Sequence, residues 1–203
     1  MLKKLAPLTL VLAATLGTSA CAPIIVGSMV GGVLVATDRR TSGAQLEDQT
    51  IEFKSAARIR NELGDKVHVN SNSYNRVLLL SGEASSEAAR DQLTTIAKGL
   101  DSVQDVINEV EVMPASTLSS RANDTLIATK IKATLVDAKD LISGAFEVVV
   151  ERGNVYLMGR VTQREADRAS DLIRTIEGVK KVVRCFEILT EAQLDQIAPR
   201  PAK

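Results

Sequence analysis

The sequence is poor in the residues that usually build catalytic and metal sites. Its 203 residues include one histidine, two cysteines and no tryptophan, and aromatic residues make up 2% of the chain. Hydrolytic triads need a base that titrates near neutral pH, and we expect the lone His68 to be a solvent-facing strand residue. The sequence shows neither a clustered set of metal-ligating residues nor a phosphate-binding glycine loop. It therefore predicts no enzyme, no metal site and no cofactor.

An excess of charge of one sign is also lacking. The chain has 25 Lys and Arg against 25 Asp and Glu, and losing Lys3 and Lys4 with a leader peptide would leave 23 against 25. Proteins that bind nucleic acid usually carry a strongly basic surface. The near-neutral balance therefore argues against a nucleic-acid partner.

The longest apolar run lies at the N-terminus. Lys3 and Lys4 precede an apolar stretch from Leu5 to Leu16, and the small residues Thr18-Ser19-Ala20 follow before Cys21. This order is typical of a secretory signal, and the stretch is shorter than the roughly 20 apolar residues that a spanning helix needs. We expect residues 1–20 to be a signal peptide.

The cysteine that follows these small residues resembles the lipobox of bacterial lipoproteins. The resemblance implies that the Cys21 thiol is diacylated, with chains such as palmitate, and that the new α-amine takes a third chain. Ala22 stands where an inner-membrane retention signal would have Asp, which implies a lipid anchor on the periplasmic face of the outer membrane. The alternative is an ordinary secreted protein with a chance cysteine. Lipidation would leave Cys185 as the only free thiol, so no intramolecular disulfide would form.

An apolar, glycine-rich segment covers residues 22–37. Gly27 and Gly31 have the GxxxG spacing of membrane-helix contacts, but a sixteen-residue segment with three glycines and Pro23 is too short and irregular to span a bilayer. We expect it to lie close to the membrane surface or to pack on the protein. Residues 38–43, Asp-Arg-Arg-Thr-Ser-Gly, should then return the chain to water.

An internal repeat organises the rest of the chain. Residues 78–84 (LLLSGEA) align with 155–161 (VYLMGRV), and residues 106–112 (VINEVEV) align with 182–188 (VVRCFEI). The repeat predicts two domains, at 47–113 and 121–190, with a lipidated segment and linker at 21–46 and a second linker at 114–120. Residues 191–203 are expected to form a disordered tail.

The residue pattern of each repeat predicts helices and strands in the order α-β-β-α-β. In the second, Ile127, Ile131 and Leu135 recur on one helix face, and Asn123 or Asp124 is expected to cap that helix. Strands are expected at 146–151, 155–161 and 182–189, and a Thr162–Glu165 capping box should begin the second helix. The fold class is thus α+β: two tandem small domains, each with a three-stranded mixed sheet covered by two helices on one face.

This repeat resembles the BON domain, a module named for its occurrence in bacterial osmotic-stress and nodulation-related proteins. The residues that carry the resemblance are Gly82, Gly159, the Gly178-Val179 pair and the Val-x-Asn-x-Val-x-Val of 106–112. A lipobox, Asp38-Arg39-Arg40-Thr41 and two such repeats together resemble the dual-BON outer-membrane lipoproteins, which implies a role in envelope integrity and division. Two places depart from the family pattern: the first repeat has Leu100-Asp101-Ser102 where Gly is usual, and the second has Arg184 where Asn is frequent.

The charge difference between the repeats indicates a binding surface. The first has seven basic against twelve acidic residues and the second twelve against ten, so the second suits an anionic lipid surface. Opposite the buried face of its first helix, the residues Leu126, Thr129, Lys130 and Lys132 combine an apolar tip with cations. The sequence predicts that these four residues bind anionic phospholipid. The alternative is that Leu126 packs against the first repeat and the lysines are solvated.

A second hypothesis is a protein–protein scaffold for outer-membrane assembly, division or cell-wall remodelling machinery. The acidic first repeat would then carry the contact through the carboxylates Asp101, Asp105, Glu109 and Glu111. A partner captured from that face would favour this hypothesis over lipid binding.

Overall fold

The computed structural model describes residues 38–197, which form the same sequence of elements twice. Domain one consists of α3 (Ser42–Leu63), β1 (Val67–Tyr74), β2 (Val77–Ala84), α4 (Glu87–Lys98) and β3 (Asp105–Val112). Domain two consists of α5 (Leu118–Asp137), β4 (Phe146–Glu151), β5 (Asn154–Thr162), α6 (Gln163–Arg174) and β6 (Lys181–Leu189). Short 3₁₀ turns, Gly64–Lys66 and Ser143–Ala145, precede β1 and β4. The predicted α-β-β-α-β order is therefore confirmed in both repeats.

Each domain has one three-stranded mixed sheet with the second strand of the hairpin in the centre. The strand orders are β1-β2-β3 and β4-β5-β6. The first two strands of each sheet are antiparallel because a two-residue turn joins them, and the third is parallel to the second because a helix makes the crossover. The predicted fold class is thus confirmed.

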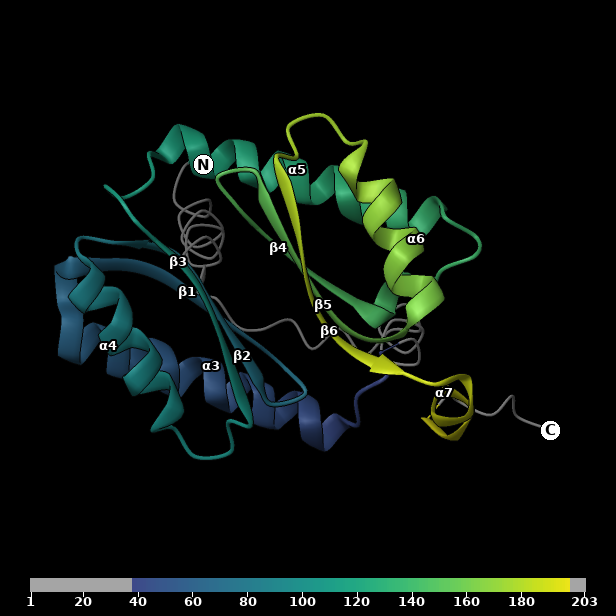
Figure 1. The fold of residues 1–203 in the computed structure, drawn as a ribbon, viewed down its shortest axis with the longest axis horizontal. Coiled ribbons are helices and arrows are strands. Elements are labelled where there is room, and N and C mark those ends of the chain that lie inside the picture. The colour runs from purple at the N-terminus through teal and green to yellow at the C-terminus, as the bar shows by residue number, and fades with distance from the viewer. Residues whose placement is uncertain (1–37, 198–203) are drawn as a thin grey trace, which may run out of the picture. The chain divides into compact units, whose positions relative to one another are not determined.

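Both helices of each domain cover one face of its sheet (Figure 1). In domain two, Ile127, Ile131 and Leu135 of α5 and Ile173 of α6 pack on the inward side chains of β5. The Thr162–Glu165 capping box begins α6 as predicted. Domain one repeats this core with Ile51, Ile59 and Leu63 from α3 and Leu93 from α4. The apolar periodicity of the helices therefore marks the core correctly.

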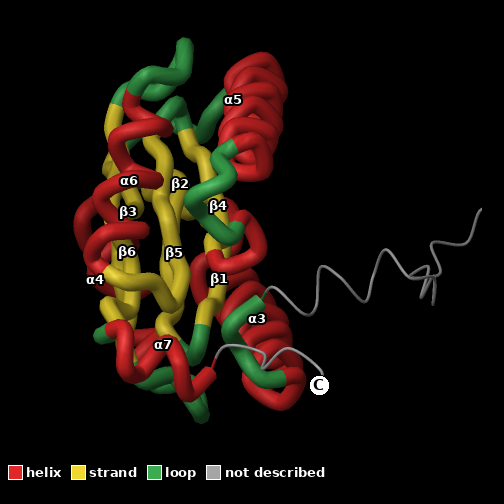
Figure 2. The backbone as a smooth tube through the Cα atoms, turned by 90° about the vertical axis from the view of Figure 1, so that its right-hand side faces the viewer, coloured by secondary structure: helices red, strands yellow, loops and turns green. Residues whose placement is uncertain are grey.

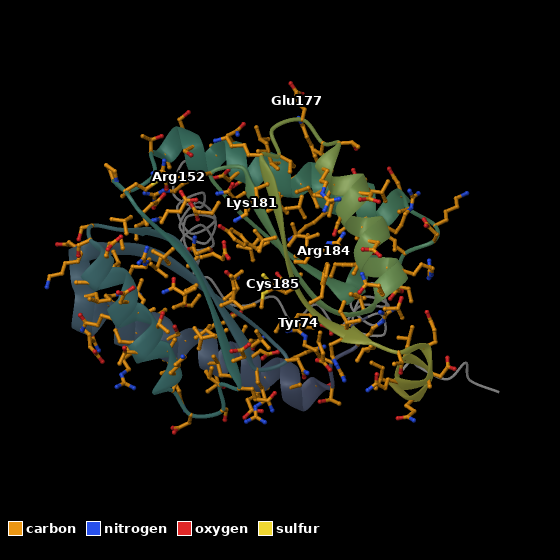
Figure 3. All side chains as sticks on the ribbon, in the orientation of Figure 1. Tyr74, Arg152, Glu177, Lys181, Arg184 and Cys185 are labelled. Carbon is orange, nitrogen blue, oxygen red and sulfur yellow. The ribbon has the colours of Figure 1, made fainter. Side chains whose placement is uncertain are left out.

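The opposite faces of the two sheets pack against each other. Tyr74 and Leu79 of domain one form one buried cluster with Tyr156, Met158 and Cys185 of domain two. Figure 1 shows the strands between α3 and α4 on one side and α5 and α6 on the other. In the view of Figure 2, α3 and α5 lie along one side of the strands and α4 and α6 along the other. In Figure 3, Tyr74 and Cys185 lie between the two sheets. The central strands are therefore buried on both faces, which explains why residues 78–80 and 155–158 are unbroken apolar runs.

Gly82 and Gly159 occupy equivalent places in the central strands, where only glycine fits. Their φ angles are 124° and 155°. A Cβ at Gly82 would lie 2.1 Å from the carbonyl oxygen of His68, and one at Gly159 would lie 2.3 Å from that of Ala145. The two glycines that mark the repeat therefore allow the central strand to lie close to the backbone of His68 in domain one and of Ala145 in domain two.

Some boundaries differ from the prediction. The first helices begin earlier than expected, at Ser42 and Leu118, and Thr117 rather than Asn123 or Asp124 caps α5. Part of the expected disordered tail forms α7 (Glu191–Ile197), where Thr190 and Gln193 exchange hydrogen bonds at the helix start. The predicted signal peptide at residues 1–20, the predicted lipidation site Cys21 and the segment 22–37 lie outside the described residues.

Candidate functional site

The outer face of α5 carries the largest set of exposed apolar side chains on one helix of the described residues. Leu118, Leu126 and Val136 are 81%, 63% and 68% exposed. They lie opposite Ile127, Ile131 and Leu135, so α5 is apolar on both sides although only one side meets the core. A soluble surface helix normally has a polar outer face. This face is therefore a candidate binding surface.

The four predicted lipid-binding residues all lie on the solvent side of α5. Leu126, Thr129, Lys130 and Lys132 are exposed, and the Thr129 hydroxyl donates to the carbonyl of Thr125 within the helix. Lys130 Nζ lies 3.6 Å from Glu177 on the loop after α6, which is labelled in Figure 3. Because both side chains are exposed, this ion pair is weak. Leu126 is 63% exposed and therefore does not pack against domain one, whereas Lys130 and Lys132 are exposed to solvent, as the alternative interpretation expected.

Asp124, which was expected at the start of α5, is a buried residue that holds a hairpin turn. Its carboxylate accepts from the backbone N–H groups of Arg152 and Gly153 at 2.9 and 2.8 Å. Both turn residues have positive φ, which costs about 1 kcal/mol or more for arginine. Asp48 of α3 holds the Asn75-Arg76 turn of domain one in the same way. Sequence analysis missed this role, although an aspartate precedes the first buried isoleucine of each helix by three residues.

The same turn connects the two domains. The Arg152 guanidinium binds the carboxylate of Glu83, which is almost fully buried in β2, and donates to the carbonyl of Pro114 at 2.6 Å. The other carboxylate oxygen of Glu83 lies 3.2 Å from Nδ1 of His68. His68 is thus a partly buried member of a hydrogen-bond network around Glu83, which corrects the expectation of a solvent-facing residue.

Residues 38–43 were expected to return the chain to water, but Arg39 and Arg40 instead contact the folded domains. Arg39 is buried and makes two hydrogen bonds, of 2.8 and 2.7 Å, to the carboxylate of Glu165 in domain two. Arg40 binds Asp48 of domain one and stacks on the ring of Tyr74, with 4.0 Å between the guanidinium carbon and the ring centroid. The segment therefore joins both domains immediately after the part of the chain that would connect to the lipid anchor.

These contacts change the pKa of Glu165. Burial by itself would raise the pKa of this carboxyl, but the hydrogen bonds from Arg39 and from the Thr162 backbone outweigh it and hold the pKa below its usual range. Glu165 is therefore ionised at neutral pH and is a matched partner for Arg39.

The four predicted acidic contact residues do not form one free surface. Asp105, Glu109 and Glu111 lie on the same face of β3 as Ile107, which packs against the buried cluster between the domains. Lys181 binds Glu109 at 3.5 Å, and Asn154 donates to Glu111 at 3.2 Å. Asp101 lies apart from them, after α4, where Lys54 is 3.9 Å away. Glu109 and Glu111 are therefore engaged in contacts with domain two, whereas Asp101 lies beside a lysine of its own domain.

Among the described residues, the one cysteine is buried at the same interface. Cys185 packs with Tyr156 and Met158 between the sheets. Burial and the nearby carboxylate of Glu109 raise the pKa of the Cys185 thiol to about 11. A thiol in this state is a poor nucleophile.

Residues 38–197 contain no group of three or more His, Cys, Asp and Glu side chains that could hold a metal ion. In the same range, no helix is both long and apolar enough to cross a membrane.

At the two places where the sequence departs from the BON pattern, other residues maintain the local structure. Ser102 has a φ of 71°, the left-handed conformation that Gly178 adopts at 95° in domain two. Asn108 ties β3 to α4 through hydrogen bonds to the Arg90 carbonyl and the Thr94 hydroxyl. In domain two, Arg184 ties β6 to α6 by an ion pair with Asp167 at 2.6 Å.

Comparison with known proteins agrees with this architecture. Residues 47–114 and 123–190 each match the BON domain. The chain is 35% identical over 190 residues to the outer membrane lipoprotein DolP of Haemophilus influenzae, covering 93% of this chain and 97% of that protein. It is 28% identical to the 21 kDa hemolysin of Actinobacillus pleuropneumoniae over 72% of this chain and 77% of the relative.

A third relative is the osmotically-inducible protein Y of Escherichia coli, 29% identical over 74% of this chain and 77% of its own length. The similarity to an outer membrane lipoprotein over nearly the whole chain confirms the predicted location at the outer membrane. Because two BON matches cover most of the chain, in the two domains that the structure shows, the chain belongs to the BON domain family.

Proposed function

We propose that this envelope protein binds anionic phospholipid surfaces without catalysis, through the outer face of α5, and thereby supports outer-membrane integrity. The observation that carries the proposal is the exposed apolar row Leu118, Leu126 and Val136 beside Lys130 and Lys132. Apolar side chains flanked by cations suit a helix that lies in a membrane interface, with its lysines at the phosphates. An acylated Cys21 would hold the helix near that surface.

The expected affinity is weak. Partial insertion of three aliphatic side chains contributes roughly 2–5 kcal/mol, and two lysines contribute about 1 kcal/mol each. The sum corresponds to a dissociation constant between about millimolar and micromolar. A lipid anchor would raise the local concentration of the membrane surface, so that even this affinity is sufficient for lasting contact.

The test is binding of the full mature chain, residues 21–203 with Cys21→Ser to prevent acylation, to vesicles with and without anionic phospholipid. We expect binding that depends on the anionic lipid and weakens as salt is raised. Leu126→Glu and Lys130→Glu should each reduce binding about tenfold, because the first buries a charge and the second repels phosphate. NMR shift changes should concentrate in α5.

Domain one offers matched control variants. Phe53 on α3 is 77% exposed, and Lys54 is about as exposed as Lys130 and also lies near an exposed carboxylate. Phe53→Glu and Lys54→Glu should leave binding nearly unchanged if α5 is the site. Equal losses from both helices, or no loss from the α5 variants, would show that charge or hydrophobicity in general, rather than α5, drives the binding.

A protein–protein scaffold for outer-membrane assembly, division or cell-wall remodelling machinery is the second candidate. The observation that favours it is an exposed aromatic and aliphatic pair on α3, Phe53 and Leu46, for which lipid binding by α5 gives no reason. Photo-crosslinking in cells from Phe53 and from Asp101 should then capture one dominant protein. Crosslinks to lipid alone would reject the scaffold.

A further inference from the structure

A cavity of about 360 Å³ with a mixed polar and apolar lining lies beside α5, between the two domains. One side of it is formed by Arg121, Asp124, Thr125 and Ala128, which follow one another along α5 at helical spacing, and the Asp124 carboxylate is already bound to the backbone of the β4–β5 turn. The other sides come from the edge strands: His68 and Asn70 of β1, and Val150 and Glu151 of β4. The cavity thus opens next to the face of α5 that we propose to contact lipid.

Glu151 is the unusual residue of this cavity. It is 6% exposed, and one of its oxygens accepts from the Asn70 amide at 2.9 Å. Within residues 38–197 no Lys or Arg side chain forms an ion pair with Glu151, because the nearby Arg152 binds Glu83 instead. A buried carboxylate without a cation is costly. Burial and the neighbouring Glu83 accordingly raise the pKa of Glu151. An external donor group would relieve that cost.

Arg121 stands at the rim of the cavity with spare donors. Its Nε and Nη2 bind the hydroxyl and carbonyl of Ser116, at 3.3 and 2.9 Å, which fixes the guanidinium. Its Nη1 has no hydrogen-bond partner among the residues described. A fixed guanidinium with a free edge is suited to a phosphate oxygen.

We propose that this cavity holds the tip of a phospholipid headgroup. Arg121 contacts the phosphate, and Glu151 accepts hydrogen bonds from hydroxyl or ammonium groups at the tip of the headgroup. The proposal rests on the proposed function, because α5 must lie on the lipid surface. In that orientation a headgroup extends from the phosphate level toward the protein, along the side of α5 formed by Arg121, Thr125 and Ala128.

The test compares lipids of equal charge that differ in headgroup donors. The full mature chain with Cys21→Ser is titrated with phosphatidylcholine vesicles that contain either phosphatidylglycerol or phosphatidylmethanol in the same proportion. Each of these lipids carries one negative charge, but only the glycerol headgroup has hydroxyls. We expect about tenfold tighter binding to phosphatidylglycerol, the effect of a charge-assisted hydrogen bond. Replacing phosphatidylcholine with phosphatidylethanolamine, whose ammonium has N–H donors, should likewise strengthen binding.

Two variants close or neutralise the cavity. Ala128→Leu fills it from α5, and we expect the preference for phosphatidylglycerol to fall to about one while binding to anionic vesicles remains. Glu151→Gln should lower the preference too, because an amide oxygen accepts more weakly than a carboxylate. The matched control is Ala133→Leu, which adds the same side chain on the exposed face of α5. It should strengthen binding to both lipids equally. Thermal unfolding of each variant verifies the fold.

The outcomes separate the two proposals. A preference that is lost in Ala128→Leu and Glu151→Gln but kept in Ala133→Leu supports the headgroup site. Equal binding of the two anionic lipids by the unaltered chain overturns the headgroup site but leaves the proposed function in place. A preference for phosphatidylglycerol that survives in both cavity variants has the same two consequences. No binding to either anionic vesicle overturns the proposed function itself.

Discussion

Removing the Arg39 side chain should cost the protein a large part of its stability. Arg39 and Glu165 are 6% and 3% exposed, and two hydrogen bonds of 2.8 and 2.7 Å join them. In Arg39→Ala the Glu165 carboxylate would stay buried without its cation. Breaking a buried ion pair from one side costs about 3–5 kcal/mol, a large fraction of the 5–15 kcal/mol that typically stabilises a domain.

The assay is urea unfolding of the mature chain with Cys21→Ser, monitored by circular dichroism. The dependence of the unfolding free energy on urea concentration is compared between variants. The matched control is Arg168→Ala. Arg168 lies 2.9 Å from Asp140, but both side chains are about half exposed, so this substitution should cost no more than about 1 kcal/mol. A double variant, Arg39→Ala with Glu165→Ala, should cost clearly less than the sum of the single variants.

An Arg39→Ala cost as small as that of Arg168→Ala would refute the reasoning. It would mean that residues 38–40 are not docked between the domains in solution, and that Glu165 has water or another cation as its partner. A large cost that is simply additive with Glu165→Ala would refute the pairing itself, although not the burial of each residue.

Three further predictions follow from the contacts described above. Asp124→Ala should destabilise the protein by about 2–5 kcal/mol in urea unfolding, because two buried backbone N–H groups lose their acceptor; a loss below 1 kcal/mol would show that water replaces the carboxylate. Cys185 should react with a thiol reagent only as fast as the domains open, because its pKa is raised to about 11 and it is buried; fast labelling in native buffer would contradict the packed interface. Glu165 has a folded pKa below its ordinary 4.5, so its contribution to stability is present above that pH and is lost as the pH falls through the lower folded value. Stability should therefore fall less steeply in acid in Glu165→Gln than in the unaltered chain, and identical acid profiles would show that the pair does not persist.

The candidate site could be predicted from the sequence only in part. Leu126, Thr129, Lys130 and Lys132 were placed correctly on the solvent side of α5, because a helix fixes which residues share a face. Arg121 and Glu151 were missed, since their cavity forms where α5 meets the edge strands of both domains. The four carboxylates of the acidic hypothesis do not form one free surface, because Glu109 and Glu111 contact Lys181 and Asn154 of domain two. Those contacts cannot be recognised from the first repeat alone.

The sequence by itself determined the two domains and nearly every element within them. Local features are sufficient for this: apolar residues at helical spacing, the Thr162–Glu165 capping box, and glycines at positions where a Cβ would collide. The repeat also showed that one fold occurs twice. These features act over a few residues, so no knowledge of distant contacts is needed to recognise them.

Only the tertiary structure decided how the two domains meet. The outward face of each sheet is apolar enough to need a cover, and each sheet covers the other through Tyr74, Leu79, Tyr156 and Met158. The run Leu78-Leu79-Leu80 could have indicated burial on both faces, but a strand pattern does not say which surface lies opposite. Arg39 and Glu165 are 126 residues apart in the chain. Their pairing depends on distances in space that the sequence of charges does not encode, so the connection between the N-terminal segment and domain two appears only in the folded protein.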